Sequence, residues 1–215
     1  MINLELVASV FICLIVLIDG QRPYFGGCPK IKSARNVKID KFLGKWYEVE
    51  RSFYIYEIPT SCTSVNITRP NNTTKELEVS IKTFNRWTRR PIESNGKATP
   101  KGDGSAVLDY RVNSRLPDFL ARLLPGAGRY TLLATDHDTY AVIYSCSDLR
   151  FLHAGLYGDI LIGAVVPGPP DTVWVLGRKP DIPVWARAEA YDKLVTAGLG
   201  TDQLVLSNRK NCKET

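Results

Sequence analysis

Short runs in which apolar and polar residues alternate fill most of this chain, a pattern typical of strands that bury one face. Eight such runs lie between turn residues, at 45–51, 62–69, 76–84, 92–99, 105–113, 129–136, 139–146 and 172–179. No helix of ten or more residues separates consecutive runs, which excludes a parallel α/β sheet. The pattern predicts an all-β protein, either an eight-stranded up-and-down antiparallel barrel or a sandwich.

A different periodicity near the C-terminus predicts one α-helix over residues 183–197. Pro183 suits a first helical turn, and Gly198 supplies a stop. Apolar residues at spacings of three and four mark a stripe on this helix, made of Trp185, Ala188, Tyr191 (or Asp192) and Val195. We expect the helix to pack on the outside of the sheet through this stripe, ahead of a short last strand at 203–206.

The alternation also predicts which side chains face the interior. Asn66 must face solvent if its sequon carries a glycan, so Val65 and Ile67 on either side would point inward. The same parity in neighbouring strands gives further inward positions at Thr63, Leu77, Val79, Ile81, Thr83, Leu108, Tyr110 and Val112. An eight-stranded barrel either fills with side chains or holds one small ligand, and these medium-sized residues favour a cavity.

The N-terminus reads as a secretory signal. Residues 6–18 form an uncharged apolar run that is too short to span a membrane but suits a signal core, and Gly20 supplies a small residue at its end. Glu5 departs from the usual pattern, because no Lys or Arg precedes the run; a membrane anchor or a buried helix is the alternative. We predict a signal at residues 1–20, one domain at 21–215 and a secreted protein.

Removal of residues 1–20 takes away Glu5 and Asp19, so the net charge of +6 becomes +8. No block of Lys or Arg longer than the Arg89-Arg90 pair occurs, and we therefore predict no nucleic-acid partner. With only two histidines and no Cys-x-x-Cys pair, no metal site is expected.

Cysteines and sequons support export. An even number of widely spaced cysteines remains after removal of the signal, at positions Cys28, Cys62, Cys146 and Cys212. Two disulfides are expected in an exported chain, although spacing alone does not choose among the three pairings. Asn66, Asn71 and Asn72 each begin a glycosylation sequon, and the adjacent Asn71 and Asn72 are not expected to carry glycans together.

Three motifs, in order, resemble the signatures of the lipocalin family. The motifs are Gly-Lys-Trp, Thr-Asp-x-x-x-Tyr and a final Arg. Their residues are Gly44, Trp46, Thr135, Asp136, Tyr140 and Arg178. Cys62, Cys146 with its preceding Tyr-Ser, and the C-terminal cysteine resemble the apolipoprotein D-like and bilin-binding subgroup. The resemblance covers about residues 28–212 and implies the lipocalin barrel with one helix outside.

The resemblance also assigns roles to individual residues. It implies disulfides Cys28–Cys146 and Cys62–Cys212. Trp46 would close the barrel floor, with Arg178 stacked on its indole in a structural rather than catalytic pair. Trp174 matches a ligand-contacting tryptophan of the subgroup, with plain core filling as the alternative.

Two long connections depart from the family pattern, at 114–126 and 147–171. The first resembles a short amphipathic helix begun at Pro117, and both contain apolar residues near arginines. At the open end of a barrel they would form a lid or an extra hairpin, or else contact a membrane or lipoprotein surface.

Catalysis is not expected, because disulfides would consume every cysteine of the mature chain and no nucleophile elbow, P-loop or zinc-protease motif occurs. Glu48 and Glu50 share the inward parity of Trp46 and could orient a polar ligand group. A protease-inhibitor or amine-scavenging function is compatible with the lipocalin fold, but no residue of the sequence specifically indicates it.

The sequence thus predicts a secreted, glycosylated carrier of one small hydrophobic ligand, such as a fatty acid, a steroid, a retinoid or a bilin, with no cofactor besides a bilin held as ligand. The expected pocket residues are Val65, Ile67, Leu77, Val79, Ile81, Leu108, Tyr110 and Trp174.

Overall fold

The computed structural model describes residues 29–53, 58–71, 74–101, 106–117, 121, 126–146, 171–202, 204–210 and 212. Its strands are β1 (Gly44–Ser52), β2 (Thr60–Thr68), β3 (Leu77–Asn85), β4 (Arg90–Pro100), β5 (Val107–Val112), β6 (Gly128–Thr135), β7 (Tyr140–Ser145), β8 (Thr172–Gly177) and β9 (Leu204–Leu206). Its helices are α2 (Ile39–Phe42) and α5 (Val184–Thr196). The eight predicted strands, the helix and the last strand are therefore present at nearly the predicted positions.

The first eight strands close into an antiparallel barrel. Each pairs with its successor along the chain, and β8 returns to pair with β1. Strand β9 is added to the end of β1, at Glu50 to Ser52. Closure removes the free sheet edges that an open sheet would expose. The predicted up-and-down barrel is thereby confirmed, and the sandwich alternative is excluded.

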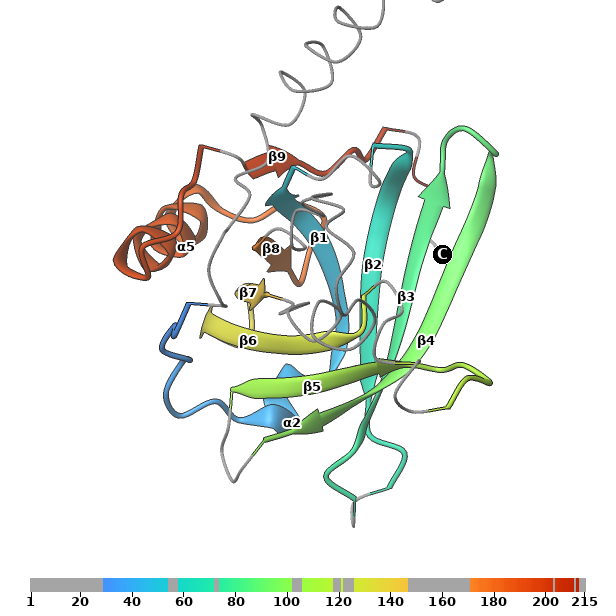
Figure 1. Ribbon diagram of the computed structural model, residues 1–215. Coiled ribbons are helices and arrows are strands. Elements are labelled where there is room, and N and C mark those ends of the chain that lie inside the picture. The colour runs from blue at the N-terminus through green and yellow to red at the C-terminus, as the bar shows by residue number, and fades with distance from the viewer. Residues whose placement is uncertain are drawn as a thin grey trace, which may run out of the picture.

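The two ends of the barrel differ. The connections β1–β2, β3–β4, β5–β6 and β7–β8 share one end because the strands alternate in direction. At the other end lies α2, opposite the β3–β4 hairpin in Figure 1. Sequence analysis missed this helix, since it spans only four residues and has no side-chain cap. We call its end the floor and the other end the mouth.

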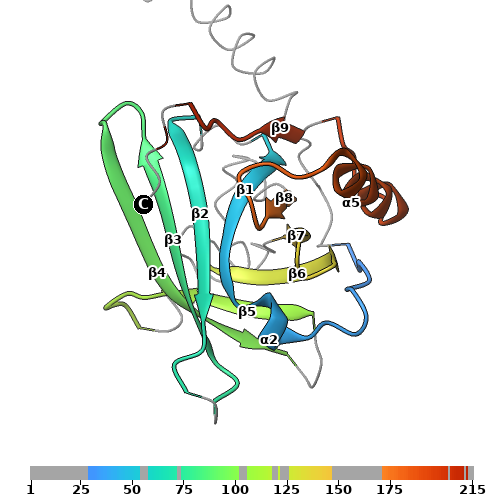
Figure 2. The same cartoon turned by 180° about the vertical axis from the view of Figure 1, so that it is seen from behind.

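Helix α5 packs outside the barrel against β6 and β7, on the side away from the β3–β4 hairpin in both views (Figure 1 and Figure 2). Its buried face consists of Ala186, Ala190 and Leu194. The predicted stripe is wrong at three positions, because Trp185 and Val195 are 55% and 65% exposed and Ala188 is exposed as well. Its fourth member, Tyr191, does pack against the outer core. Small alanines let the helix approach the sheet closely, whereas the pattern of large apolar residues pointed to the outer face.

A β-bulge in β1 sends two consecutive residues to the same side of the sheet. The register with β8 shifts between Glu48 and Glu50. Val49 packs in the outer core beneath α5, and Glu50 also faces that helix, with its carboxylate 2.7 Å from the Arg187 guanidinium. The predicted inward orientation therefore holds for Glu48 and is wrong for Glu50.

A disulfide joins Cys62 of β2 to Cys212, the pairing that the resemblance implies. The amide of Cys62 also donates to the Asn208 carbonyl at 2.9 Å, so the C-terminal segment is tied across the barrel wall. Cys146 is disulfide-bonded too, and its predicted partner Cys28 lies outside the described residues.

The predicted signal (1–20) and most of both long connections also lie outside the described residues. Within the part of the chain that the structure describes, no helix combines the length and apolarity needed to cross a membrane. Of the three sequon asparagines, Asn66 and Asn71 are exposed, and Asn72 is not described.

Candidate functional site

Trp46 fills the floor of the barrel. It is completely buried, and its indole N–H donates to the Phe42 carbonyl of α2 at 2.9 Å. The Arg178 guanidinium lies over the indole, 3.8 Å from the ring centroid. A planar cation at this distance from an aromatic face is attracted by the ring quadrupole. The floor is thus built as expected, with an aromatic plug and a cation stacked on it.

Arg178 also fastens the segments that meet beneath the barrel. Its guanidinium donates to backbone carbonyls of Lys41 (2.6 Å), Leu43 (2.9 Å) and His137 (3.0 Å). Burial lowers the pKa of Arg178, but these carbonyls and the indole surround the charge with acceptors. Gly44 has φ +97°, and a Cβ there would come within 3.3 Å of the Arg178 guanidinium, which explains glycine in the first motif.

The second motif shapes the β6–β7 turn. The Asp136 carboxylate accepts the backbone N–H groups of Thr139 at 2.8 Å and Tyr140 at 3.0 Å, and the Thr135 hydroxyl donates to the Tyr140 carbonyl. Burial alone would raise the pKa of Asp136, but the N–H donors of Tyr140 and Thr139 outweigh it and lower that pKa.. This turn presents the His137 carbonyl to Arg178, so the motif residues are structural.

Above the floor the barrel holds a cavity of about 250 Å³. Seven of the eight predicted pocket residues line it, namely Val65, Ile67, Val79, Ile81, Leu108, Tyr110 and Trp174. The eighth prediction is wrong, since Leu77 is fully buried in the inner core and does not contribute to the lining. Leu77 begins β3 and lies at the level where side chains of the floor already fill the barrel.

Sequence analysis missed several lining residues. Tyr130, Ile143 and Leu176 face the cavity from β6, β7 and β8, and parity could have found them by extending the alternation to these strands. Phe42 reaches the cavity from the unpredicted helix α2, and Arg51 does so only because the bulge changes the parity of β1.

Aromatic rings form one side of the cavity. The Tyr110 and Tyr130 rings meet edge to face with centroids 5.8 Å apart, and the Trp174 ring follows at 5.6 Å from Tyr130. Burial raises the pKa of Tyr110, so the phenol stays neutral at physiological pH. Rings arranged in this way offer a continuous apolar surface to a ligand.

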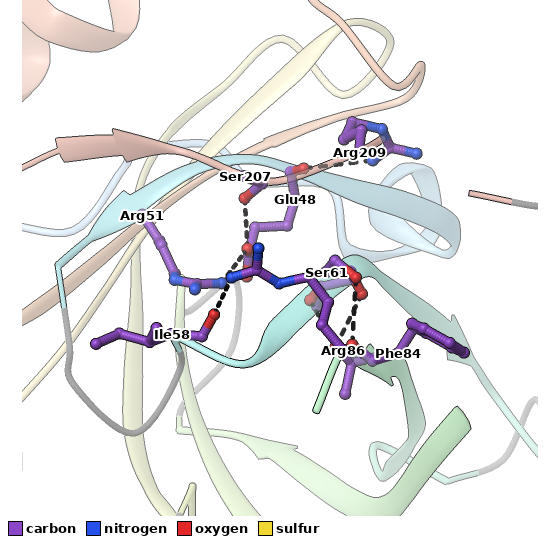
Figure 3. A network of polar contacts seen from close by, with 10 residues as sticks. Glu48, Arg51, Ile58, Ser61, Phe84, Arg86, Ser207 and Arg209 are labelled. Carbon is purple, nitrogen blue, oxygen red and sulfur yellow. Dashed lines mark hydrogen bonds and ion pairs between the residues drawn. The ribbon is translucent and has the colours of Figure 1, made fainter. Parts of the chain in front are cut away.

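Polar side chains gather in the half of the cavity nearer the mouth. Glu48 is 3% exposed and forms a 2.7 Å ion pair with Arg51, and both line the cavity. The Ser207 hydroxyl donates to the same oxygen of Glu48, so that Arg51 and Ser207 converge on one carboxylate (Figure 3). The Thr63 and Thr83 hydroxyls, 3.0 Å apart, also line the cavity, from β2 and β3.

The described residues contain no group of three or more His, Cys, Asp or Glu side chains placed to hold a metal ion. Three cysteines, Cys62, Cys146 and Cys212, are bound in disulfides and offer no thiol. The cavity offers a ligand apolar contact and a few hydrogen-bonding groups.

No family model matches the chain. Among known proteins it is 27% identical to apolipoprotein D of Cavia porcellus over 210 residues, which cover 97% of this chain and 96% of the relative. It is 28% identical to apolipoprotein D of Rattus norvegicus over 220 residues, covering 100% and 99%. The chain is thus similar to the apolipoprotein D lipocalins over nearly its whole length. Insecticyanin from the tobacco hornworm Manduca sexta shares the fold with a TM-score of 0.65 and 14% identity, over 87% of this chain and 89% of that one.

In this barrel the three motifs meet at one place. They come from β1, from the β6–β7 turn and from the residue after β8, and Arg178 contacts all of them. The motif residues therefore build the floor of the barrel, below the cavity.

Proposed function

We propose that this lipocalin is a secreted carrier that encloses one small hydrophobic ligand in its barrel. The observation that carries the proposal is the cavity of about 250 Å³, closed at the floor and lined mostly by apolar side chains. Burying apolar ligand surface there gains about 25 cal/mol per Å². A few polar groups then fix orientation rather than supply most of the affinity.

The size of the cavity favours a compact ligand. Ligand pockets commonly measure about 300–1,000 Å³, and this cavity is slightly smaller. A fatty acid, a steroid or a retinoid therefore suits it better than a linear tetrapyrrole. Export is proposed from the N-terminal apolar run, the disulfides and the exposed sequon residues Asn66 and Asn71.

Ligand titration of two tryptophan variants tests carriage. Trp174→Ala removes a ring from the cavity wall, and we expect affinity for a fluorescent polyene fatty acid or retinol to fall about tenfold. Trp185→Ala is the matched control, because Trp185 lies on the outer face of α5. Equal affinities in wild type and both variants would mean that Trp174 does not belong to the ligand-binding site.

A second candidate function is docking of the mouth on a lipid surface. Exposed apolar side chains belong to connections at this end: Phe53, Ile58, Trp87 and Leu116. Trp87 is 73% exposed at the tip of the β3–β4 hairpin, beside the exposed Arg86, Arg89 and Arg90. Tryptophan with nearby arginine is the composition that binds the interface of an anionic membrane.

Hydrogen bonds within the turn fix the conformation of the β3–β4 hairpin tip. The Asn85 side-chain oxygen accepts the amides of Trp87 at 3.0 Å and Thr88 at 2.9 Å, and Arg89 adopts a positive φ of 55°. This turn displays the indole of Trp87 away from the barrel. It is a different segment from the two long connections that the sequence suggested for the same role.

Co-sedimentation with vesicles tests docking. Phosphatidylcholine vesicles containing phosphatidylserine should bind the wild type, and Trp87→Ala should weaken binding about tenfold, since a buried aromatic side chain is lost from the interface. Trp185→Ala again controls for loss of an exposed tryptophan elsewhere. Docking is wrong if the wild type stays in the supernatant or if both variants bind alike.

A further inference from the structure

Glu48 is a buried carboxylate that does not use all of its hydrogen-bonding capacity. Arg51 at 2.7 Å and Ser207 both donate to Oε1. Oε2 accepts from neither of them and is not among the fully buried atoms that have no partner, so it is open to the cavity that Glu48 lines. A carboxylate oxygen that faces an apolar cavity is normally satisfied by a donor. The free acceptor at this position points to a ligand that brings a donor.

The surroundings of Glu48 place this acceptor at one end of a ligand. The lower cavity, toward Trp46, is lined by apolar side chains such as Phe42, Ile67 and Val79. Thr63 and Arg51 lie on the mouth side, where Glu48 belongs to the polar half. A ligand with an apolar body would therefore enter body first and leave its polar head near Glu48.

Charge decides which head group fits. Glu48 and Arg51 form an ion pair of zero net charge. An ammonium head would leave a net positive charge in the enclosure, and a carboxylate head would leave a net negative charge there. A hydroxyl donates to Oε2 without adding charge.

We infer that the cavity selects a neutral lipid alcohol, whose hydroxyl donates to Oε2 of Glu48 while its apolar body lies between the aliphatic and aromatic walls. The inference rests on the proposed carrier function and adds the class of ligand. Glu48 acts as a positioning and specificity group in this arrangement, with Arg51 and Ser207 holding its carboxylate.

The chain contains a matched control for Glu48. Glu50 lies two residues along the same strand and is 1% exposed, but the bulge turns it toward α5. Its two oxygens contact Arg187 at 2.7 Å and the Tyr191 hydroxyl at 2.5 Å. Glu50→Gln removes a buried carboxylate from β1 without touching the cavity.

Three probes with one tail and different heads test the inference, namely dodecanol, dodecylamine and dodecanoic acid, each competing against a neutral fluorescent probe. The wild type should bind dodecanol about tenfold more tightly than either charged probe, the range expected for a hydrogen bond to a charged acceptor. Glu48→Gln should reduce this preference to about twofold, whereas Glu50→Gln should keep it. If Glu48 has only a structural role, Glu48→Gln should lower the melting temperature and leave the ratios of affinity among the three probes unchanged.

The outcomes separate the two proposals. If no probe binds the wild type, the carrier function fails. If the wild type binds the acid or the amine as tightly as the alcohol, carriage stands and the inference is overturned. If Glu48→Gln does not fold, the ranking of the three probes by the wild type decides alone.

Discussion

Two buried carboxylates on one strand show how the inside and the outside of this barrel differ. Glu50 lies in the outer layer, where Arg187 and Tyr191 of α5 occupy both of its oxygens. Glu48 lies in the inner layer, where Arg51 and Ser207 share one oxygen. In the outer layer an ion pair and a hydrogen bond tie the carboxylate to the helix that covers the sheet. The inner layer encloses a cavity, and Oε2 of Glu48 accepts from neither Arg51 nor Ser207.

The same contrast runs vertically through the interior. At the floor, Trp46 is fully buried, hydrogen-bonded to Phe42 and covered by Arg178. At the level of Trp174 the interior is open, and the ring lines a cavity. Two tryptophans inside one barrel therefore have different tasks, and substitution should separate stability from binding.

The largest expected effect is at the floor. Trp46→Ala should lower the free energy of unfolding by about 3–5 kcal/mol, because it empties a filled site and leaves Arg178 without its aromatic partner. Denaturant unfolding followed by circular dichroism measures the change. Trp185→Ala, at an exposed position, should stay within about 0.5 kcal/mol of the wild type. A Trp46→Ala protein as stable as this control would contradict the floor assignment.

A smaller effect is expected in the outer layer. Burial first, and then the hydrogen bond to Glu50, raise the pKa of Tyr191 to about 12. A raised pKa in the folded state means that Tyr191 stabilises the fold below pH 10, and that this contribution disappears between about pH 10 and 12. Tyr191→Phe should therefore cost about 1–2 kcal/mol at neutral pH, from the lost hydrogen bond to a charged partner.

The difference in stability between wild type and Tyr191→Phe should then shrink as the pH rises from 10 to 12. Unfolding midpoints measured at several pH values give this difference directly, and other alkaline titrations cancel between the two proteins. A difference that is constant with pH would mean that the pKa of Tyr191 is not raised in the folded protein.

Much of the fold follows from local pattern. Alternation found every barrel strand, because each strand buries one face and exposes the other. The same alternation placed Val65, Ile67, Val79 and Ile81 on the cavity. Leu77 shares their parity and is still not part of the lining, since parity gives the side of the wall but not the height above the floor.

The remaining errors come from features that depend on three-dimensional packing. The bulge at Glu48 to Glu50 inserts one residue and reverses the parity of everything after it, so Glu50 was assigned to the wrong face and Arg51 was overlooked. Helix α5 turns Ala186 and Ala190 to the sheet because close approach requires small side chains, and no pattern of large apolar residues can indicate that. The motif residues Trp46 and Arg178 lie far apart in sequence, and only the resemblance brought them together.

Native mass spectrometry of the purified protein, incubated with a total lipid extract from its source, tests the central claim most directly. A carrier with Glu48 in its cavity should retain one molecule per chain, and that molecule should be a neutral lipid bearing a hydroxyl. A protein that retains nothing would contradict carriage, and one that retains only charged lipids would contradict the role of Glu48.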